Sequence, residues 1–271
     1  MANSLFIKKL EKLWDKNKFV CIGLDPAISS LPKGISSFYK FNKEIIDATH
    51  DLVLAYKPNS AFYEAKGPDG IKELKQTIDY IKSKNSKITV ILDAKRADIG
   101  STNEGYVAFA FDYLGVDAIT LHPYLGREAL QPFLDRKDKG AIILVRTSNP
   151  GAGEFQDIKN EHGEPLYLTV AKKVAGEWNE NGNIAMVVGA TYPNELKLVR
   201  KAVGDIPFLI PGIGAQGGDV EKTVINGKNK QNQGMIINSS RGIIFASSGA
   251  NFAASARQKT VELNQEIIKY L

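Results

Sequence analysis

The stretch Ile88–Gly100 reads ITVILDAKRADIG, and it joins an apolar, β-branched run to a cluster of alternating charges. The run up to Leu92 has the composition of a strand that is buried on both faces. Side chains two residues apart on a strand share a face, so we expect Asp93 and Lys95 to point the same way at its end. A paired surface charge explains this stretch as well as an active site does. Taken alone, the stretch leaves both interpretations open.

Similar short apolar runs recur along the chain. Eight of them are expected to be strands: Phe19–Leu24, Leu52–Tyr56, Ile88–Leu92, Ala118–Leu121, Ala141–Val145, Ile184–Val188, Phe208–Ile210 and Met235–Ile237. Most of the gaps between them hold a helical pattern, such as Gly70–Lys84 with its apolar residues three and four apart. A further helix is expected from Ser101, with Glu104 at capping-box spacing and Gly115 just after its end.

Strands that alternate with helices, with no linker or low-complexity tract, predict an α/β fold in which residues 1–271 form a single (β/α)8 barrel of the TIM type. A doubly wound open sheet is the alternative, but the first strand runs into GLDPAISSLP, which lacks a dinucleotide-binding glycine pattern. Active sites of barrels lie at the carboxyl ends of the strands. Polar side chains end several of the expected strands, which favours a catalytic site over a solvated surface: Asp25, Lys57, Asp93, Lys95, His122, Thr147 and Ser148.

The segments after the last two strands have the composition of a phosphate site. The segment after the seventh strand holds Gln216 among four glycines, and Arg241 follows the eighth strand in SSRG. Barrels often bind phosphate at these two loops, where glycines admit the anion and arginine makes a forked contact. The alternative is a pair of glycine-rich turns beside a surface arginine.

The charge cluster consists of Lys57, Asp93, Lys95 and Asp98. Two lysines supply the positive charge that a divalent ion would otherwise bring, so no metal is expected. Alternating lysines and aspartates hold one another ionised, which suits delivery of a proton to carbon. Covalent catalysis by a lysine ranks lower, because neighbouring aspartates raise the pKa that such a lysine needs lowered.

Composition narrows the class of protein. A net charge of +5 over 271 residues, with no basic block, gives little support for nucleic-acid binding. No apolar run approaches the length of a membrane span, and the N-terminal segment resembles an amphipathic helix rather than a signal peptide. Cys21 is the one cysteine, which excludes an intrachain disulfide and suits a cytoplasmic protein.

His122 is expected to support a loop, and residues 150–167 form either a lid or a surface excursion.

With these motifs in place, the chain resembles the orotidine 5′-phosphate decarboxylase family. The resemblance rests on GLDP, KPNSAFYEAKG, LDAKRADIGSTN, HPYLG, TSNPG, PGIGAQGGD and SSRGI, which together cover most of the chain. The form KPNSAFYE looks like the branch found in many bacteria and some protists. The family converts orotidine 5′-monophosphate to uridine 5′-monophosphate and CO2, the last step of pyrimidine synthesis, without cofactor or metal.

The resemblance also implies roles for individual residues. Lys95 would donate the proton to C6 of the pyrimidine, Asp93 would lie beside the departing carboxylate, and Lys57 and Asp98 would complete the charged array. The remaining implied roles are contacts to substrate: Asp25 and Thr102 to the ribose, Ser148 to the pyrimidine, and Gln216 and Arg241 to the phosphate. Members of the family are homodimers in which Asp98 and Thr102 would enter the partner's site.

Two alternatives stay open at this point. A hexulose-phosphate synthase or 3-keto-sugar-phosphate decarboxylase would share the barrel and the D-x-K-x-x-D motif, but would use Mg²⁺ and carry a carboxylate in place of Lys57. A non-catalytic phosphonucleotide-binding protein would not need Asp93, Lys95 and Asp98 together.

Overall fold

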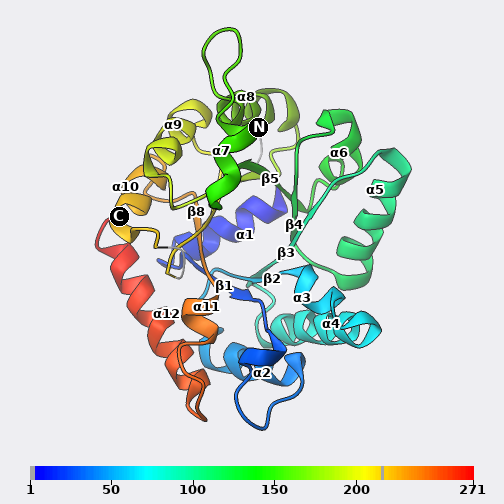
Figure 1. The fold of residues 1–271 in the computed structure, drawn as a ribbon, viewed down its shortest axis with the longest axis vertical. Coiled ribbons are helices and arrows are strands. Elements are labelled where there is room, and N and C mark those ends of the chain that lie inside the picture. Colours follow the sequence, from blue (N-terminus) through cyan, green and yellow to red (C-terminus); the bar gives the residue numbers. More distant parts are fainter. Residues whose placement is uncertain (1–3, 215–216) are drawn as a thin grey trace.

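The computed structural model describes residues 4–214 and 217–271, and its centre is a closed barrel of parallel strands (Figure 1). The strands are β1 (Val20–Leu24), β2 (Ala55–Pro58), β3 (Thr89–Arg96), β4 (Ala118–Leu121), β5 (Gly140–Arg146), β6 (Ile184–Val188), β7 (Phe208–Pro211) and β8 (Met235–Ser239). They follow one another in chain order, and β8 pairs with β1 to close the sheet. The predicted (β/α)8 barrel is confirmed.

Helices surround the barrel, and the longer ones bury an apolar stripe. They are α1 (Leu5–Trp14), α2 (Phe38–Thr49), α3 (Ser60–Glu64), α4 (Gly67–Lys84), α5 (Gly100–Val107), α6 (Gly126–Leu134), α7 (Gly153–Gln156), α8 (Leu166–Lys173), α9 (Pro193–Val203), α10 (Val220–Gly227), α11 (Arg241–Ile244) and α12 (Phe252–Ile268). In α4 the buried stripe contains Leu74, Ile78 and Ile81, as the spacing predicts. Within the described part of the chain, no helix is both long and apolar enough to cross a bilayer.

Helix α1 covers the amino end of the barrel and crosses the centre of the view in Figure 1. Its Trp14 indole donates to the carbonyl of Met235, where β8 begins, at 2.8 Å. Its Phe6 ring lies so close to Gly140, where β5 begins, that a Cβ there would come within 2.6 Å of the ring. Because α1 covers this end, the carboxyl end is where a ligand can enter the barrel.

Several expected boundaries differ from the structure by one to four residues. Strand β2 begins at Ala55 rather than Leu52, because the Leu52 amide closes a turn onto Thr49 at the end of α2. Strand β3 continues past Leu92 to Arg96. The capping box at Ser101 is wrong, since α5 starts earlier and has Ile99 at its N-cap without a side-chain cap. Gly115 does end this helical segment in a left-handed conformation, at φ 75°.

Candidate active site

A cavity of about 750 Å³ lies at the carboxyl ends of the strands. Its volume is typical of sites for small molecules. Seven of the residues singled out in the sequence line it: Asp25, Lys57, Asp93, Lys95, Thr147, Ser148 and Arg241. The prediction that polar strand ends converge on one site therefore holds for these seven.

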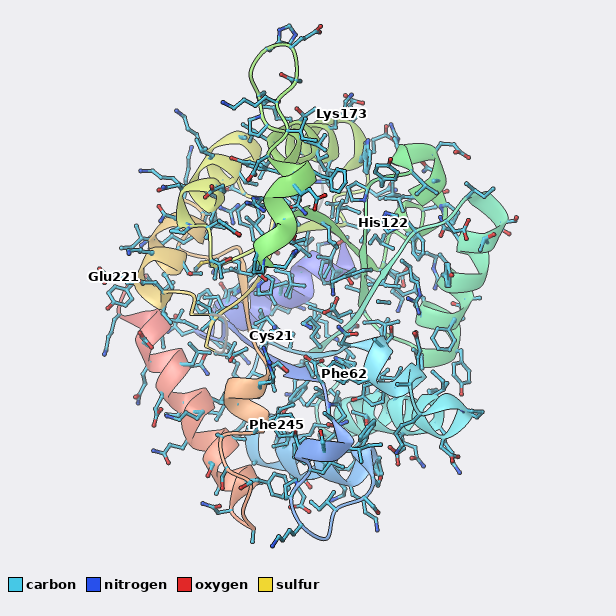
Figure 2. All side chains as sticks on the ribbon, in the orientation of Figure 1. Cys21, Phe62, His122, Lys173, Glu221 and Phe245 are labelled. Atoms are coloured by element: carbon cyan, nitrogen blue, oxygen red, sulfur yellow. The ribbon has the colours of Figure 1, made fainter. Side chains whose placement is uncertain are left out.

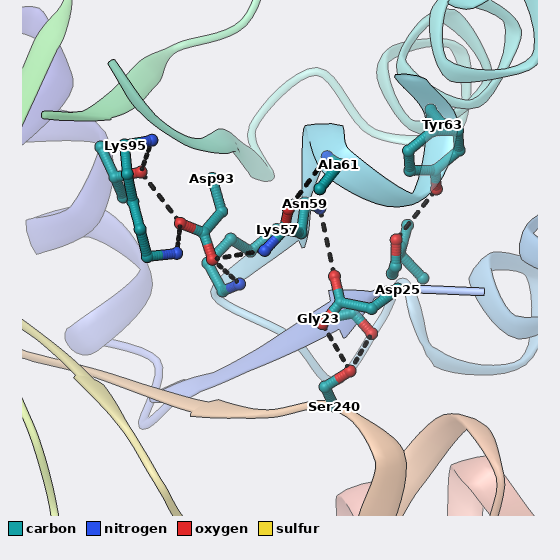
Figure 3. Close-up of polar contacts among 11 residues, drawn as sticks. Gly23, Asp25, Lys57, Asn59, Ala61, Tyr63, Asp93, Lys95 and Ser240 are labelled. Atoms are coloured by element: carbon teal, nitrogen blue, oxygen red, sulfur yellow. Dashed lines mark hydrogen bonds and ion pairs between the residues drawn. The ribbon is translucent and has the colours of Figure 1, made fainter. Parts of the chain in front are cut away.

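Asp93 is the centre of the charged side of the cavity. Its Oδ2 lies 2.7 Å from the Lys57 ammonium and its Oδ1 lies 2.6 Å from the Lys95 ammonium (Figure 3). The side chains of Lys57 and Asp93 are 5% and 11% exposed, whereas that of Lys95 is 48% exposed. Lys95 is thus the cation of this cluster that a ligand in the cavity can reach most freely.

The ion pairs keep this cluster charged despite its burial. Burial alone would raise the pKa of Asp93, but the charges of Lys57 and Lys95 hold that pKa well below its usual range. Burial likewise opposes the charge on Lys57, and the negative charges of Asp93 and Asp25 outweigh it and raise the lysine pKa. Both carboxylate oxygens of Asp93 are occupied by ammonium groups, which leaves it poorly placed to bind a metal ion.

The backbone at Lys95 departs from a regular strand. Lys95 adopts φ 47°, a left-handed conformation that is costly for a residue with a Cβ, and the pairing of β3 with β4 shifts register between Leu92 and Arg96. Thr120 on β4 stabilises this geometry, because its Oγ1 accepts from the Lys95 amide at 3.0 Å and donates to Asp93 Oδ1 at 2.9 Å. The expected proximity of Lys95 to Asp93 is observed, through a bulge rather than through simple alternation.

A second hydrogen-bonded group joins β1, β2 and β8 (Figure 3). Asp25 accepts from the Asn59 amide through Oδ1 at 3.1 Å and from the Ser240 hydroxyl through Oδ2 at 2.7 Å. The Asn59 carboxamide also donates to Asp93 Oδ2 at 3.5 Å. Asn59 therefore connects the Asp25 group to the Asp93 cluster.

The opposite side of the cavity is built differently. Leu144 on β5, Val187 on β6 and Leu209 on β7 give it an apolar floor. Above this floor, Ser148 packs against Gly189 so closely that a Cβ at Gly189 would lie 2.8 Å from the Ser148 Cβ. Glycine at this position lets the serine loop approach β6.

The expected phosphate loop has the backbone that its glycines predict. Gly212, Gly214 and Gly217 adopt φ values of 110°, 90° and 78°, which favour glycine. Gly212 and Arg241 line the same end of the cavity. Among the described residues, no carboxylate pairs with the exposed Arg241. Gln216 lies outside the described residues.

Asp98 and Thr102 do not line the cavity of their own chain. Asp98 Oδ1 accepts from the amide of Ile99 at 2.7 Å, and Thr102 is exposed on α5. The buried Asn103 carboxamide fixes this turn, since its Oδ1 accepts from the Asp98 amide at 2.9 Å. The four-residue charge cluster expected from the sequence therefore has three members within one chain.

Sequence reasoning missed Asn59 and Thr120, and it assigned the loop that holds Ser240 to phosphate binding without the contact of Ser240 with Asp25. Asn59, Thr120 and Ser240 each follow or end a strand near a recognised residue, in KPN, ITLH and NSSR, and that position was the available signal. Figure 2 labels Phe62 on α3 and Phe245 at the end of α11, and both line the cavity, whereas His122 does not. Cys21 is fully buried, and burial raises the pKa of its thiol to about 12.

Comparison with known proteins gives consistent results. The family described as "Orotidine 5′-phosphate decarboxylase / HUMPS" matches residues 18–256. Orotidine 5′-phosphate decarboxylase of Cellvibrio japonicus is 47% identical over 97% of both chains, and that of Herpetosiphon aurantiacus is 49% identical over 94% of both. The solved structure of Leishmania donovani OMP decarboxylase superimposes with a TM-score of 0.84 at 35% identity, covering 97% of this chain and 98% of its own.

Proposed function

The chain belongs to the orotidine 5′-phosphate decarboxylase family, and from this membership we propose that it converts orotidine 5′-monophosphate to uridine 5′-monophosphate and CO2 in pyrimidine synthesis. The observation that carries the proposal is the carboxylate of Asp93 held between the ammonium groups of Lys57 and Lys95 at the entrance of the barrel. This arrangement provides fixed positive charge and an acid beside a fixed negative charge.

The proposed reaction breaks the bond between C6 of the pyrimidine and its carboxylate. CO2 leaves without the electron pair, the pair stays on C6, and a proton from the Lys95 ammonium is transferred to C6. The neutral amine then regains a proton from solvent. Ammonium groups that are already in place stabilise the developing carbanion without reorganisation. Asp93 would lie beside the substrate carboxylate, so repulsion in the ground state would favour the departure of that group as CO2.

Other cavity residues would orient the nucleotide. Asp25, already bonded to Ser240 and Asn59, would accept hydrogen bonds from the ribose. Ser148 would contact the pyrimidine above the apolar floor. Arg241 would bind the phosphate together with Gln216, and its lack of an ion-pair partner among the described residues supports this role.

We further propose a homodimer in which Asp98 and Thr102 complete the partner's site. Their position outside the cavity of their own chain supports this proposal. Mixing inactive Lys95→Ala and Asp98→Ala proteins tests it, because a mixed dimer would contain one site with both lesions and one intact site. Recovery of activity after subunit exchange supports the shared site, and no recovery after exchange verified by mass tags refutes it.

The alternative within the same broad family is a Mg²⁺-dependent sugar-phosphate enzyme. Lys57 argues against it, because its ammonium is paired with Asp93 where a metal-binding carboxylate would be needed. The direct test follows the absorbance of orotidine 5′-monophosphate with pure protein and chelator. Turnover in chelator supports metal-free decarboxylation. A complete loss that Mg²⁺ restores favours the sugar-phosphate relatives, and binding without turnover favours a non-catalytic protein.

Two broader expectations complete the proposal. The chain would act as one domain over residues 1–271, since its strands form one barrel. It would work in the cytoplasm, for which a buried free thiol at Cys21 is suited.

A further inference from the structure

Arg146, at the end of β5, is a buried arginine that the proposed reaction does not use. It is 2% exposed. Leu144, two residues earlier, lines the cavity, and simple alternation would place Arg146 there too. The pairing of β5 with β6 shifts register between these two residues, and Arg146 lies instead against Tyr192, with its guanidinium carbon 4.1 Å from the ring centroid. The bulge thus removes a cation from the cavity and places it behind the cavity wall.

The contacts of Arg146 contribute little to the stability of the fold. Its NH2 donates to Asp157 Oδ2 at 3.1 Å, but this carboxylate is 46% exposed. Its Nε is buried and has no hydrogen-bond partner. Burying a cation costs several kcal/mol unless its partners compensate well, and an apolar side chain of similar volume often does better. The contacts that Arg146 makes therefore need another explanation.

The side chains that Arg146 contacts form hydrogen bonds with the segment that follows it. Three consecutive residues of this segment line the cavity: Thr147, Ser148 and Asn149. Arg146 NH1 donates to Gln156 Oε1 at 3.3 Å. The same oxygen accepts from the Thr147 amide at 2.9 Å, and Gln156 Nε2 donates to the Thr147 hydroxyl at 2.9 Å.

The loop after β6 holds the rest of this wall. The hydroxyl of Tyr192, whose ring covers Arg146, donates to the Asn149 carbonyl at 3.4 Å. Next to it, the Thr191 hydroxyl donates to the Ser148 carbonyl at 3.2 Å. One guanidinium thus touches α7 through Gln156 and the β6–α9 loop through Tyr192, and both segments hold the wall from behind.

We propose that Arg146 is a positioning residue that fixes residues 147–149 for recognition of the pyrimidine. The inference rests on the proposed function, in which Ser148 contacts the base. Without the guanidinium, Gln156 loses the hydrogen bond from Arg146 and Tyr192 loses its stacking partner, so the serine loop is held less firmly. The phosphate end, at Gly212 and Arg241, follows β7 and β8, and the hydrogen bonds of Gln156, Thr191 and Tyr192 described above end on residues 147–149 rather than there.

The test compares inhibition constants for uridine 5′-monophosphate and for ribose 5-phosphate, which lacks the base. Arg146→Met is expected to weaken the nucleotide roughly tenfold and ribose 5-phosphate less than about threefold, as loss of a positioned hydrogen bond predicts. Gln156→Leu, at a half-buried position at the end of α7, should show the same selectivity with less risk to folding. Arg146→Lys keeps the charge but cannot reach Gln156 and Asp157 as a fork, so it should restore affinity only in part.

Arg200 offers a matched control. Its guanidinium carbon lies 3.7 Å from the Phe208 ring centroid, and it donates to the carbonyls of Gly227 and Gly234 at the amino end of the barrel. Arg200→Met should lower stability and weaken both ligands to the same small extent.

Equal weakening of both ligands by Arg146→Met would overturn the positioning role. If Arg146→Met does not fold, Gln156→Leu decides, and unchanged selectivity there would overturn the role as well. Failure of the proposed function gives a different result, namely wild-type protein that does not convert orotidine 5′-monophosphate.

Discussion

The half of the cavity built by β1–β4 and the half built by β5–β8 balance charge in different ways. In the first half, Lys57 and Lys95 both pair with Asp93, and Asp25 accepts one hydrogen bond from Asn59 and one from Ser240, which follows β8. In the second half the floor is apolar, and Arg241 is exposed without an ion-pair partner among the described residues. The charges of the first half therefore have partners within the chain. The second half has an unpaired positive charge that can bind an anionic ligand.

This difference assigns separate tasks to the two halves. Paired charges held by neighbouring strands act on a reacting group without moving first, which is the basis of electrostatic preorganisation. An unpaired arginine beside glycine turns gains its counterion only when a phosphate binds. Binding energy from this remote group can be used to hold the reacting part of the substrate against the charged half.

The largest expected effect comes from removing the reachable cation of the charged half. Lys95→Ala should lower kcat by about 10⁴-fold, about 5.5 kcal/mol, because it removes both a proton donor and a fixed positive charge. The absorbance of orotidine 5′-monophosphate measures the rate. Binding of uridine 5′-monophosphate should survive, since the phosphate end is intact. A variant that keeps a tenth of the wild-type kcat would show that Lys95 is not the proton donor.

Replacing the shared carboxylate should reduce stability as well as activity. Asp93→Asn leaves the buried Lys57 ammonium without its counterion, and we expect about 3 kcal/mol of lost unfolding free energy at neutral pH. Because folding lowers the pKa of Asp93, its contribution is complete above the unfolded aspartate pKa of about 3.9 and disappears as the pH falls through the lower folded value. The gap between wild type and variant should therefore be constant from about pH 5 to 8 and narrow in acid.

Chemical denaturation at several pH values measures this gap. Asp79→Asn is the matched control, because Asp79 pairs with Lys75 on the surface with a carboxylate that is 56% exposed. Its effect should stay below about 0.5 kcal/mol throughout. An equal effect at both positions would remove the distinction between a preorganised pair and a surface pair.

The fold and much of the charged half could be predicted from sequence, because both depend on local patterns. Apolar runs separated by helical periods indicate a barrel, and polar residues at the strand ends then meet by topology. The left-handed Lys95 could not be predicted, since Asp93-Ala94-Lys95 has the same alternation as a regular strand. The hydrogen bonds of Thr120 that stabilise this conformation come from a different strand.

The same limit applies to β5 and to the start of α5. Nothing in the sequence near Arg146 distinguishes a bulge from regular alternation, so its location behind the wall becomes visible only in three dimensions. At α5, Ser101 and Glu104 have the spacing of a capping box, yet the buried Asn103 carboxamide binds the turn at Asp98 instead. Local propensity was outweighed there by a tertiary contact, because Asn103 also donates to the carbonyl of Ala129 on α6.

The second half of the cavity should respond through binding rather than chemistry. Arg241→Ala removes the unpaired cation, and we expect a loss of about 2 kcal/mol in kcat/KM for orotidine 5′-monophosphate, the value of a charge-assisted contact. The nucleoside orotidine, which lacks phosphate, should lose much less. Comparing the two substrates on both enzymes measures the difference. Equal losses would mean that Arg241 does not bind phosphate and that the two halves do not divide the work as described.

The smallest effect should come from packing alone. A Cβ at the buried Gly189 would lie 2.9 Å from the Ser148 Cα and 3.0 Å from its amide nitrogen, so Gly189→Ala forces the serine loop to move. Overpacking of this kind costs about 1 kcal/mol, and we expect it as a severalfold rise in KM with kcat little changed, because the ion pairs of the charged half are untouched. Gly176→Ala, at an exposed position in the helical segment Val174–Trp178, has no atom within 4 Å of the new methyl group and should leave both constants unchanged. A fall in kcat with constant KM in Gly189→Ala would instead connect the serine loop to the chemical step.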